Sequence, residues 1–156
     1  MWLIRCSINY SKWQSDEVIR ASDDLVLNPG LSVFRAISDE EISQIVVKYQ
    51  LLCKSSSPDK ATYLRIPESI IREFDLSVEF CPDPELPEYL RVRHYEIHGL
   101  ENQLGAFISR IIATANCVVP LTKSQLIELS KSIYAAMSEA ERESIKNPNW
   151  YKKLSE

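Results

Sequence analysis

The stretch Arg91-Val-Arg-His-Tyr-Glu-Ile-His98 contains the most suggestive group of side chains that could do chemistry. Successive side chains of a β-strand point to opposite faces, so His94, Glu96 and His98 would share one face of an extended segment. Imidazole and carboxylate groups bind transition metals and act as general acids and bases. The pattern therefore raises two hypotheses, a metal site and a catalytic site.

Strand geometry argues against a metal site formed by these residues alone. At a rise of about 3.3 Å per residue, His94 and His98 lie roughly 13 Å apart, whereas each zinc ligand lies about 2 Å from the ion. A neighbouring pair such as His94 with Glu96 would need further ligands from another element. We therefore expect no metal and no other cofactor, and we interpret the stretch as a solvated strand face.

Arg35 is a second candidate because it shares one face of a predicted strand with Val33 and Ile37, on the apolar side of the sheet. A buried guanidinium needs a carboxylate partner or an anionic ligand. We favour a structural ion pair or an edge residue whose head group reaches solvent; the alternative is an arginine that binds the phosphate or carboxylate of a ligand. The carboxylates available to it are Glu96, Glu79 and Asp75.

Arg35, the run Ser55-Ser56-Ser57 and Glu96 occur in an order that resembles the Arg, Ser-Thr-Ser and Glu arrangement of the ADP-ribosyltransferase fold. In that family the arginine anchors the dinucleotide, the serine motif braces the site and the glutamate activates the acceptor. The resemblance implies these roles for Arg35, Ser56 and Glu96. The middle motif here is Ser-Ser-Ser, and no second carboxylate precedes Glu96 at the usual two-residue spacing. The enzyme hypothesis thus assigns catalysis to Arg35, Ser56, His94 and Glu96.

Aromatic residues near the C-terminal end suggest a binding surface instead. Trp150 and Tyr151 are adjacent in a segment with turn signals, and exposed tryptophan and tyrosine are enriched as interface anchors. They are therefore our candidate binding residues. The alternative is that the tail folds back and Trp150 fills the protein's own core.

The cysteines predict a structural role rather than a chemical one. Cys6, Cys53, Cys81 and Cys117 form no C-x-x-C pair and lie near no histidine at metal-binding spacing. The chain starts without the features of a signal peptide, so we expect reduced thiols in a cytoplasmic protein. Only three glycines are present, which disfavours a glycine loop that cradles phosphate.

Charge and hydropathy exclude further classes of function. The net charge is −4 and the isoelectric point is about 5.3, so neither nucleic acid nor an anionic membrane surface is favoured as a partner. No stretch approaches the roughly 20 apolar residues that cross a bilayer. The remaining partners are another protein, a second copy of the chain or a small molecule.

Periodicity predicts the elements that must position these residues. Alternating patterns predict strands over residues 2–8, 31–37, 62–66, 76–80 and 89–98, and residues 117–119 form a short strand or an extended connection. Apolar spacing predicts helices over residues 39–52, 104–112 and 122–137, with short helices after Pro67 and Ser138. Capping boxes mark three helix starts, at Ser38 with Glu41, Thr122 with Gln125 and Ser138 with Glu141.

This order predicts a single α+β domain over residues 1–156, with a sheet-containing core at 1–119 and a helical C-terminal extension at 120–156. We expect a mixed or antiparallel sheet of four to five strands with helices mainly on one face. The order of the strands does not follow from the pattern.

Two functions remain. The first is a cytosolic protein-interaction module without catalytic activity, in which the helical tail and the proline-rich loop at 81–87 contact another protein or a second copy. The alternative is a small transferase or hydrolase with a pocket around Arg35, His94 and Glu96, of which an ADP-ribosyltransferase is the most specific version.

Overall fold

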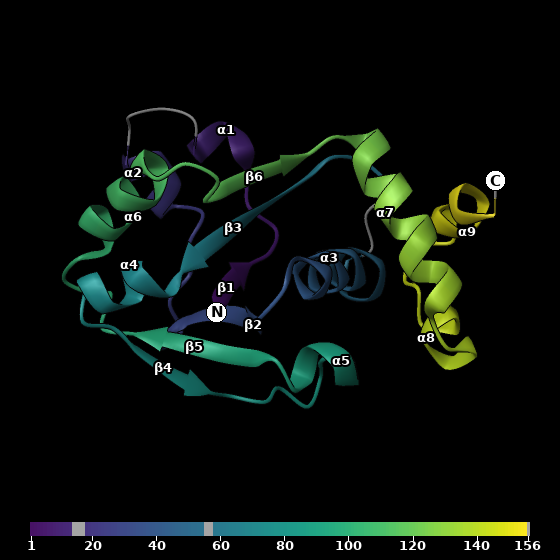
Figure 1. Ribbon diagram of the computed structural model, residues 1–156, viewed down its shortest axis with the longest axis horizontal. Helices are drawn as coiled ribbons and strands as arrows, with labels where there is room; N and C mark the ends of the chain where they lie inside the picture. Colours follow the sequence, from purple (N-terminus) through teal and green to yellow (C-terminus); the bar gives the residue numbers. More distant parts are fainter. Residues whose placement is uncertain (14–17, 55–57, 156) are drawn as a thin grey trace.

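A six-stranded antiparallel sheet forms the centre of the computed structural model (Figure 1). The structure describes residues 1–13, 18–54 and 58–155. The strands lie in the order β4-β5-β2-β1-β3-β6, so β4 and β6 are the edges. Their bounds are β1 Trp2–Arg5, β2 Leu31–Ala36, β3 Ala61–Pro67, β4 Ser77–Phe80, β5 His94–His98 and β6 Val118–Leu121.

Both faces of the sheet are apolar in its middle. Leu3 and Ile4 are neighbours on the central strand β1, so their side chains point to opposite faces, yet both are fully buried. The same holds for Val33 and Phe34 on β2. Such strands must be covered on both sides, and helices supply the cover.

One face packs against four helices, which lie together on one side of the sheet in Figure 1. Phe107, Ile108 and Ile111 of α6 are buried in this core, as are Ile70 and Ile71 of α4. The helix bounds are α1 Tyr10–Trp13, α2 Val18–Ser22, α4 Glu68–Glu73 and α6 Leu104–Ala113.

The other face is covered by α3 (Asp39–Lys48), which buries Ile42, Ile45 and Val46 against β1 and β2. Ser38 caps this helix by accepting a hydrogen bond from the Glu41 amide at 3.2 Å, as its sequence predicts. The helix does not continue regularly to residue 52. Its end widens into a π-helix, η1 (Tyr49–Cys53), a rare form that occurs frequently at functional sites.

The C-terminal helices pack outside α3 and form a third core (Figure 1). The two capping boxes predicted in this part of the chain are present, with Thr122 and Gln125 at the start of α7 and Ser138 and Glu141 at the start of α8. The bounds are α7 Lys123–Ala136, α8 Glu139–Glu143 and α9 Asn149–Leu154. Buried residues from α7, α9 and η1 fill the space between them.

The predicted fold class, a single α+β domain with a helical C-terminal segment, is confirmed, with two differences in the sheet. There are six strands rather than four to five, because Val118–Leu121 pairs with β3 as β6. The expected strand over 89–98 begins only at His94, because Pro87 precedes a short helix, α5 (Glu88–Arg91). Pro87 lacks an N–H and has a fixed φ, which suits a helix start.

Candidate functional site

His94, Glu96 and His98 share one face of β5, as predicted, but this face is not fully solvated. His94 is 7% exposed, and its ring lies edge-on to Phe34 with 5.4 Å between centroids. Its Nδ1 is hydrogen bonded to the carbonyl oxygen of Cys81. His94 is therefore a buried histidine of β5, and its hydrogen bond connects β5 to the segment after β4. The prediction of a solvated strand face is wrong for this residue.

Glu96 and His98 meet Glu79 of the edge strand β4. His98 Nε2 lies 3.3 Å from a Glu96 carboxylate oxygen and 3.4 Å from one of Glu79, so a protonated His98 would pair with both. The side chain of Glu96 is 15% exposed and that of Glu79 is 69% exposed. Within the described residues, no group of three or more histidine, cysteine or acidic side chains is arranged to hold a metal ion.

Arg35 does not join His94 and Glu96. Phe34 pairs with His94 across β2 and β5, so Arg35, the next residue, points to the opposite face of the sheet. It is exposed, and none of the described Asp or Glu side chains forms an ion pair with its guanidinium. The expected ion pair with Glu96, Glu79 or Asp75 is therefore absent there.

The described residues do not form the site that the ADP-ribosyltransferase resemblance implies. Arg35 and Glu96 lie on opposite faces of the sheet, and Ser56 lies outside the described residues. A single pocket cannot hold both charged groups in this geometry. The enzyme hypothesis therefore loses the ADP-ribosyltransferase-like arrangement, which was its most specific version.

Trp150 and Tyr151 belong to the protein's own packing. Trp150 is 1% exposed in the core formed by the C-terminal helices, so its ring is not an exposed anchor. The Tyr151 hydroxyl donates a hydrogen bond to the carbonyl oxygen of Arg142, which joins α9 to α8. The alternative in which the tail folds back and Trp150 fills the core describes this segment.

The cysteine thiols are not activated for nucleophilic chemistry. Burial raises the pKa of Cys6 far above its ordinary range, although Arg5 partly offsets the effect. Burial also raises the pKa of Cys53 and of Cys117. Desolvation raises the pKa of Cys81, and so do the charge of Glu96 and a hydrogen bond with it. All four cysteines are free thiols, and a thiol with a raised pKa supplies little thiolate at neutral pH.

The exposed side of Arg35 faces an apolar patch that the sequence did not reveal. Arg35, Ile37, Val92 and Tyr95 line a depression together with Glu41 and Arg93, and the ring of Phe80 contacts that of Tyr95 at 5.3 Å between centroids. Ile37, Phe80 and Val92 are 69%, 56% and 51% exposed, which is unusual for large apolar side chains. We call these residues the Arg35 patch: Arg35, Ile37, Phe80, Val92 and Tyr95.

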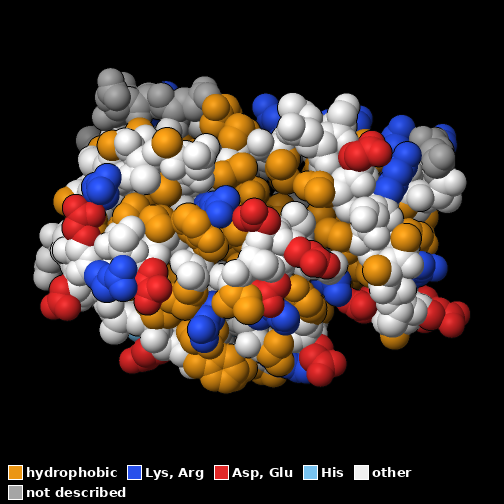
Figure 2. Space-filling model, in the orientation of Figure 1, with side chains coloured by type: hydrophobic (Ala, Val, Ile, Leu, Met, Phe, Trp, Pro, Cys, Tyr) orange, Lys and Arg blue, Asp and Glu red, His pale blue; other side chains and the backbone are white. Residues whose placement is uncertain are grey.

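The patch lies at a corner of the sheet that no described helix covers. The row Val33–Tyr95–Phe80 runs across β2, β5 and β4, and its members pass from fully buried to exposed toward the edge. Figure 2 shows hydrophobic side chains gathered along the lower rim of the molecule, over β4 and β5, with both basic and acidic side chains beside them. Patches of this composition mark interaction surfaces.

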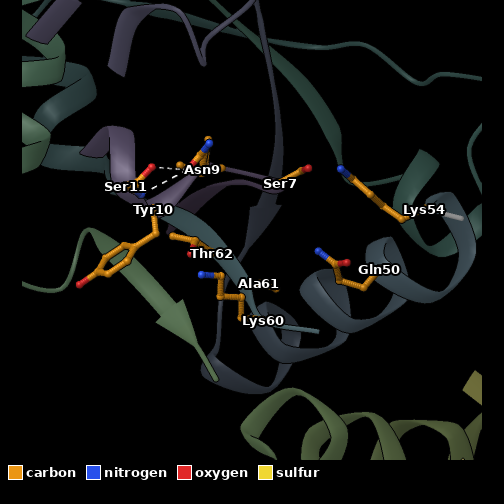
Figure 3. A pocket seen from close by; sticks show the side chains of 10 residues that line it. Ser7, Asn9, Tyr10, Ser11, Gln50, Lys54, Lys60, Ala61 and Thr62 are labelled. Atoms are coloured by element: carbon orange, nitrogen blue, oxygen red, sulfur yellow. Dashed lines mark hydrogen bonds between the residues drawn. The ribbon is translucent and has the colours of Figure 1, made fainter. Parts of the chain in front are cut away.

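A second surface feature is a polar cavity of about 550 Å³ beside the start of β3 (Figure 3). Three segments line it: residues 7–11 after β1, Gln50 in η1 with Lys54 directly after η1, and residues 60–62. No pattern in the sequence links these segments, since each contributes only two to five residues. The residue types are the only sign of this cavity that the sequence carries: its described lining contains two lysines and no carboxylate.

Comparisons with known proteins add no family. No family model matches the chain, and no curated protein or solved structure matches it either. Among the described helices, none is both long enough and apolar enough to span a bilayer.

Proposed function

We propose that this protein is a cytosolic protein-interaction module without catalytic activity and that the Arg35 patch is its contact surface. The observation that carries the proposal is the group of exposed apolar side chains, Ile37, Val92 and Phe80, beside the depression that Arg35 and Tyr95 line. Water contact with such a surface is unfavourable by about 25 cal/mol per Å². A partner that covers it removes this cost.

Arg35 gives the patch a specific chemistry. Its neighbour Arg93 stacks on the ring of Tyr89 and lies 3.7 Å from a carboxylate oxygen of Glu41, so that charge is balanced internally. The guanidinium of Arg35 has no such described partner. Arginine and tyrosine next to apolar residues are typical of interface hot spots. The partner we propose is therefore a protein that presents apolar side chains around an aspartate or glutamate.

Three features support a cytosolic location and a function without catalysis. The four free thiols fit a reducing compartment, and their raised pKa values argue against cysteine catalysis. Arg35 is separated by the sheet from His94 and Glu96, so the enzyme alternative has no assembled pocket. The net negative charge disfavours nucleic acid as the partner.

The test is photo-crosslinking from the patch inside the native cell. We expect a photoreactive phenylalanine analogue at position 80 to give a discrete crosslinked species, and we expect Arg35→Glu to abolish it. The same analogue at Val26, which is 66% exposed outside the patch, is the matched control. A species of twice the chain mass would identify a second copy as the partner.

The proposal fails if position 80 gives no discrete species, or if position 26 gives the same one. Light scattering on purified protein separates the two kinds of partner, since only self-association raises the mass of the isolated chain. Arg35→Ala should leave thermal stability unchanged within about 0.5 kcal/mol, because the side chain is exposed. A large loss of stability would instead make Arg35 a structural residue.

A further inference from the structure

We propose that the polar cavity beside β3 binds a phosphate monoester of a small polar molecule. The residues that line the cavity include Ser7, Thr62, Gln50, Lys54 and Lys60, and also Ser11, whose hydroxyl donates a hydrogen bond to Asn9 Oδ1 at 2.8 Å. This site is separate from the Arg35 patch, with which it shares no lining residue. It would supply a ligand-binding function in addition to protein interaction.

Charge is the first argument. The described chain carries more acidic than basic side chains, yet the cavity is lined by two lysines and by no carboxylate. Neither Lys54 nor Lys60 forms an ion pair within the described residues. Two like charges at one concave surface repel each other, and an anion between them removes that repulsion.

The backbone supplies the second argument. Ser7 has a φ of 63°, a left-handed conformation that costs a non-glycine residue about 1–2 kcal/mol. The neighbouring Ile8 amide donates a hydrogen bond to the Thr62 carbonyl oxygen at 3.0 Å, which fixes this turn against β3. Gln50 comes from the π-helix η1. Two uncommon backbone conformations therefore meet at one cavity, and such conformations cluster at functional sites.

The side chains converge on the cavity from opposite sides. In Figure 3 the Ser7 hydroxyl and the Lys54 ammonium group point toward one another, and the Gln50 side chain extends toward the space between them. The Lys60 side chain lies lower in the view and extends toward Thr62 and Tyr10, on the side away from Lys54. Ser7, Gln50 and Lys54 thus offer a hydroxyl, an amide and an ammonium donor around one space, and Lys60 lines another part of the cavity.

The number of charges and donors selects the ligand class. A phosphate monoester carries about −1.5 to −2 charges at pH 7 and offers three strong acceptor oxygens, which matches two lysines and several polar donors. A carboxylate would leave one lysine unbalanced. The volume of about 550 Å³ exceeds what a phosphate group needs and falls within the usual range for small-molecule pockets. The polar lining favours a polar body such as a sugar.

The test is isothermal titration calorimetry of the full chain with ribose 5-phosphate, with inorganic phosphate as the minimal probe and ribose as the uncharged control. We expect one site per chain for ribose 5-phosphate, weaker binding of inorganic phosphate, and no binding of ribose. Lys54→Gln and Lys60→Gln should each weaken binding about tenfold, because each removes a charge-assisted contact. Higher salt should weaken binding of the unmodified chain.

Two further variants separate the site from general effects. Lys152→Gln removes an exposed lysine on α9 and should leave binding unchanged. Ser7→Gly removes the hydroxyl but tolerates the left-handed backbone, so we expect about fivefold weaker binding with no fall in melting temperature. The proposal is overturned if neither phosphate probe binds at about 10 mM, or if Lys152→Gln weakens binding as much as the cavity variants.

Discussion

The Nζ atom of Lys48 lies 2.8 Å from the Oε2 atom of Glu141, a residue 93 positions later in the chain. Lys48 ends α3 on the sheet, and Glu141 lies in the first turn of α8. The ion pair therefore connects the sheet-containing core directly to the C-terminal extension.

This contact is more than a surface pair. Lys48 is 7% exposed, and its ammonium group also lies 4.3 Å from the centroid of the Tyr89 ring. Glu141 takes part in the capping box of α8 through Ser138 as well. A charge as buried as that of Lys48 needs a partner, and loss of that partner leaves its desolvation uncompensated.

We first predict that Glu141→Gln destabilises the protein by about 1–2 kcal/mol. Glutamine can replace glutamate in a capping box, so the substitution removes the charge while α8 keeps its start. Urea unfolding at neutral pH measures the change. Glu143→Gln, at an exposed position of the same helix, should change stability by less than about 0.5 kcal/mol. Equal effects of the two variants would contradict the role given to Lys48.

The second prediction concerns pH. Burial raises the pKa of Glu141, but the hydrogen bond and charge of Lys48 and the hydrogen bonds of Ser138 outweigh it and hold the pKa below its ordinary value. A carboxyl whose pKa is lowered by folding stabilises the folded state above its unfolded pKa, about 4.3 for glutamate. That stability is lost as the pH falls through the folded pKa.

The stability difference between the unmodified chain and Glu141→Gln should therefore be largest near pH 6–7 and shrink as the pH falls below about 4. Urea unfolding of both proteins at about pH 6.5 and pH 3.5 measures it. Because other carboxyl groups titrate equally in both proteins, only the difference between them reports on Glu141. A difference that grew at low pH would contradict this assignment.

The third prediction compares two glycines. A Cβ atom at Gly30 would lie 2.7 Å from the carbonyl oxygen of Ile97, so Gly30→Ala must shift the β2–β5 pairing and should cost about 1–3 kcal/mol. At Gly105, in α6, the added Cβ would meet only Val18 Cγ1 at 3.7 Å. Gly105→Ala should thus stabilise the protein by about 0.5 kcal/mol through helix propensity. Thermal unfolding of both variants checks the opposite signs.

The fourth prediction tests the placement of the C-terminal aromatic residues. Trp150→Ala should destabilise the protein by about 3–5 kcal/mol, because a buried ring leaves a large cavity. Tyr151→Phe should cost only about 1 kcal/mol through the lost hydrogen bond to Arg142. Val26→Ala, at an exposed site, serves as the control. If Trp150→Ala left unfolding unchanged, the ring would not be part of the core.

Local interactions explain which predictions from the sequence were accurate. A capping box joins residues three positions apart, so Ser38, Thr122 and Ser138 marked helix starts that the structure contains. The boxes of Thr122 and Ser138 are complete, whereas at Ser38 the Glu41 carboxylate accepts from the Ile37 amide instead. Strand alternation likewise placed His94 and Glu96 on one face. The prediction was wrong for the first part of the expected strand at 89–98. Pro87 and the turn after it favour the helix α5 over an extended strand.

Interactions between distant segments account for the rest. β1 pairs with β3 so that Ile4 lies opposite Arg65, a match that no local pattern specifies. Packing of α7 and α9 against η1 likewise buries Trp150, whose core partners Leu51 and Leu126 lie far from it in the chain. The polar cavity also requires Ser7, Gln50 and Lys60 to meet across the fold. The sequence by itself determined the fold class and most of the elements through short-range periodicity and capping. Only the tertiary structure decided the surfaces, because each is formed by strand pairings and packing between residues far apart in the chain.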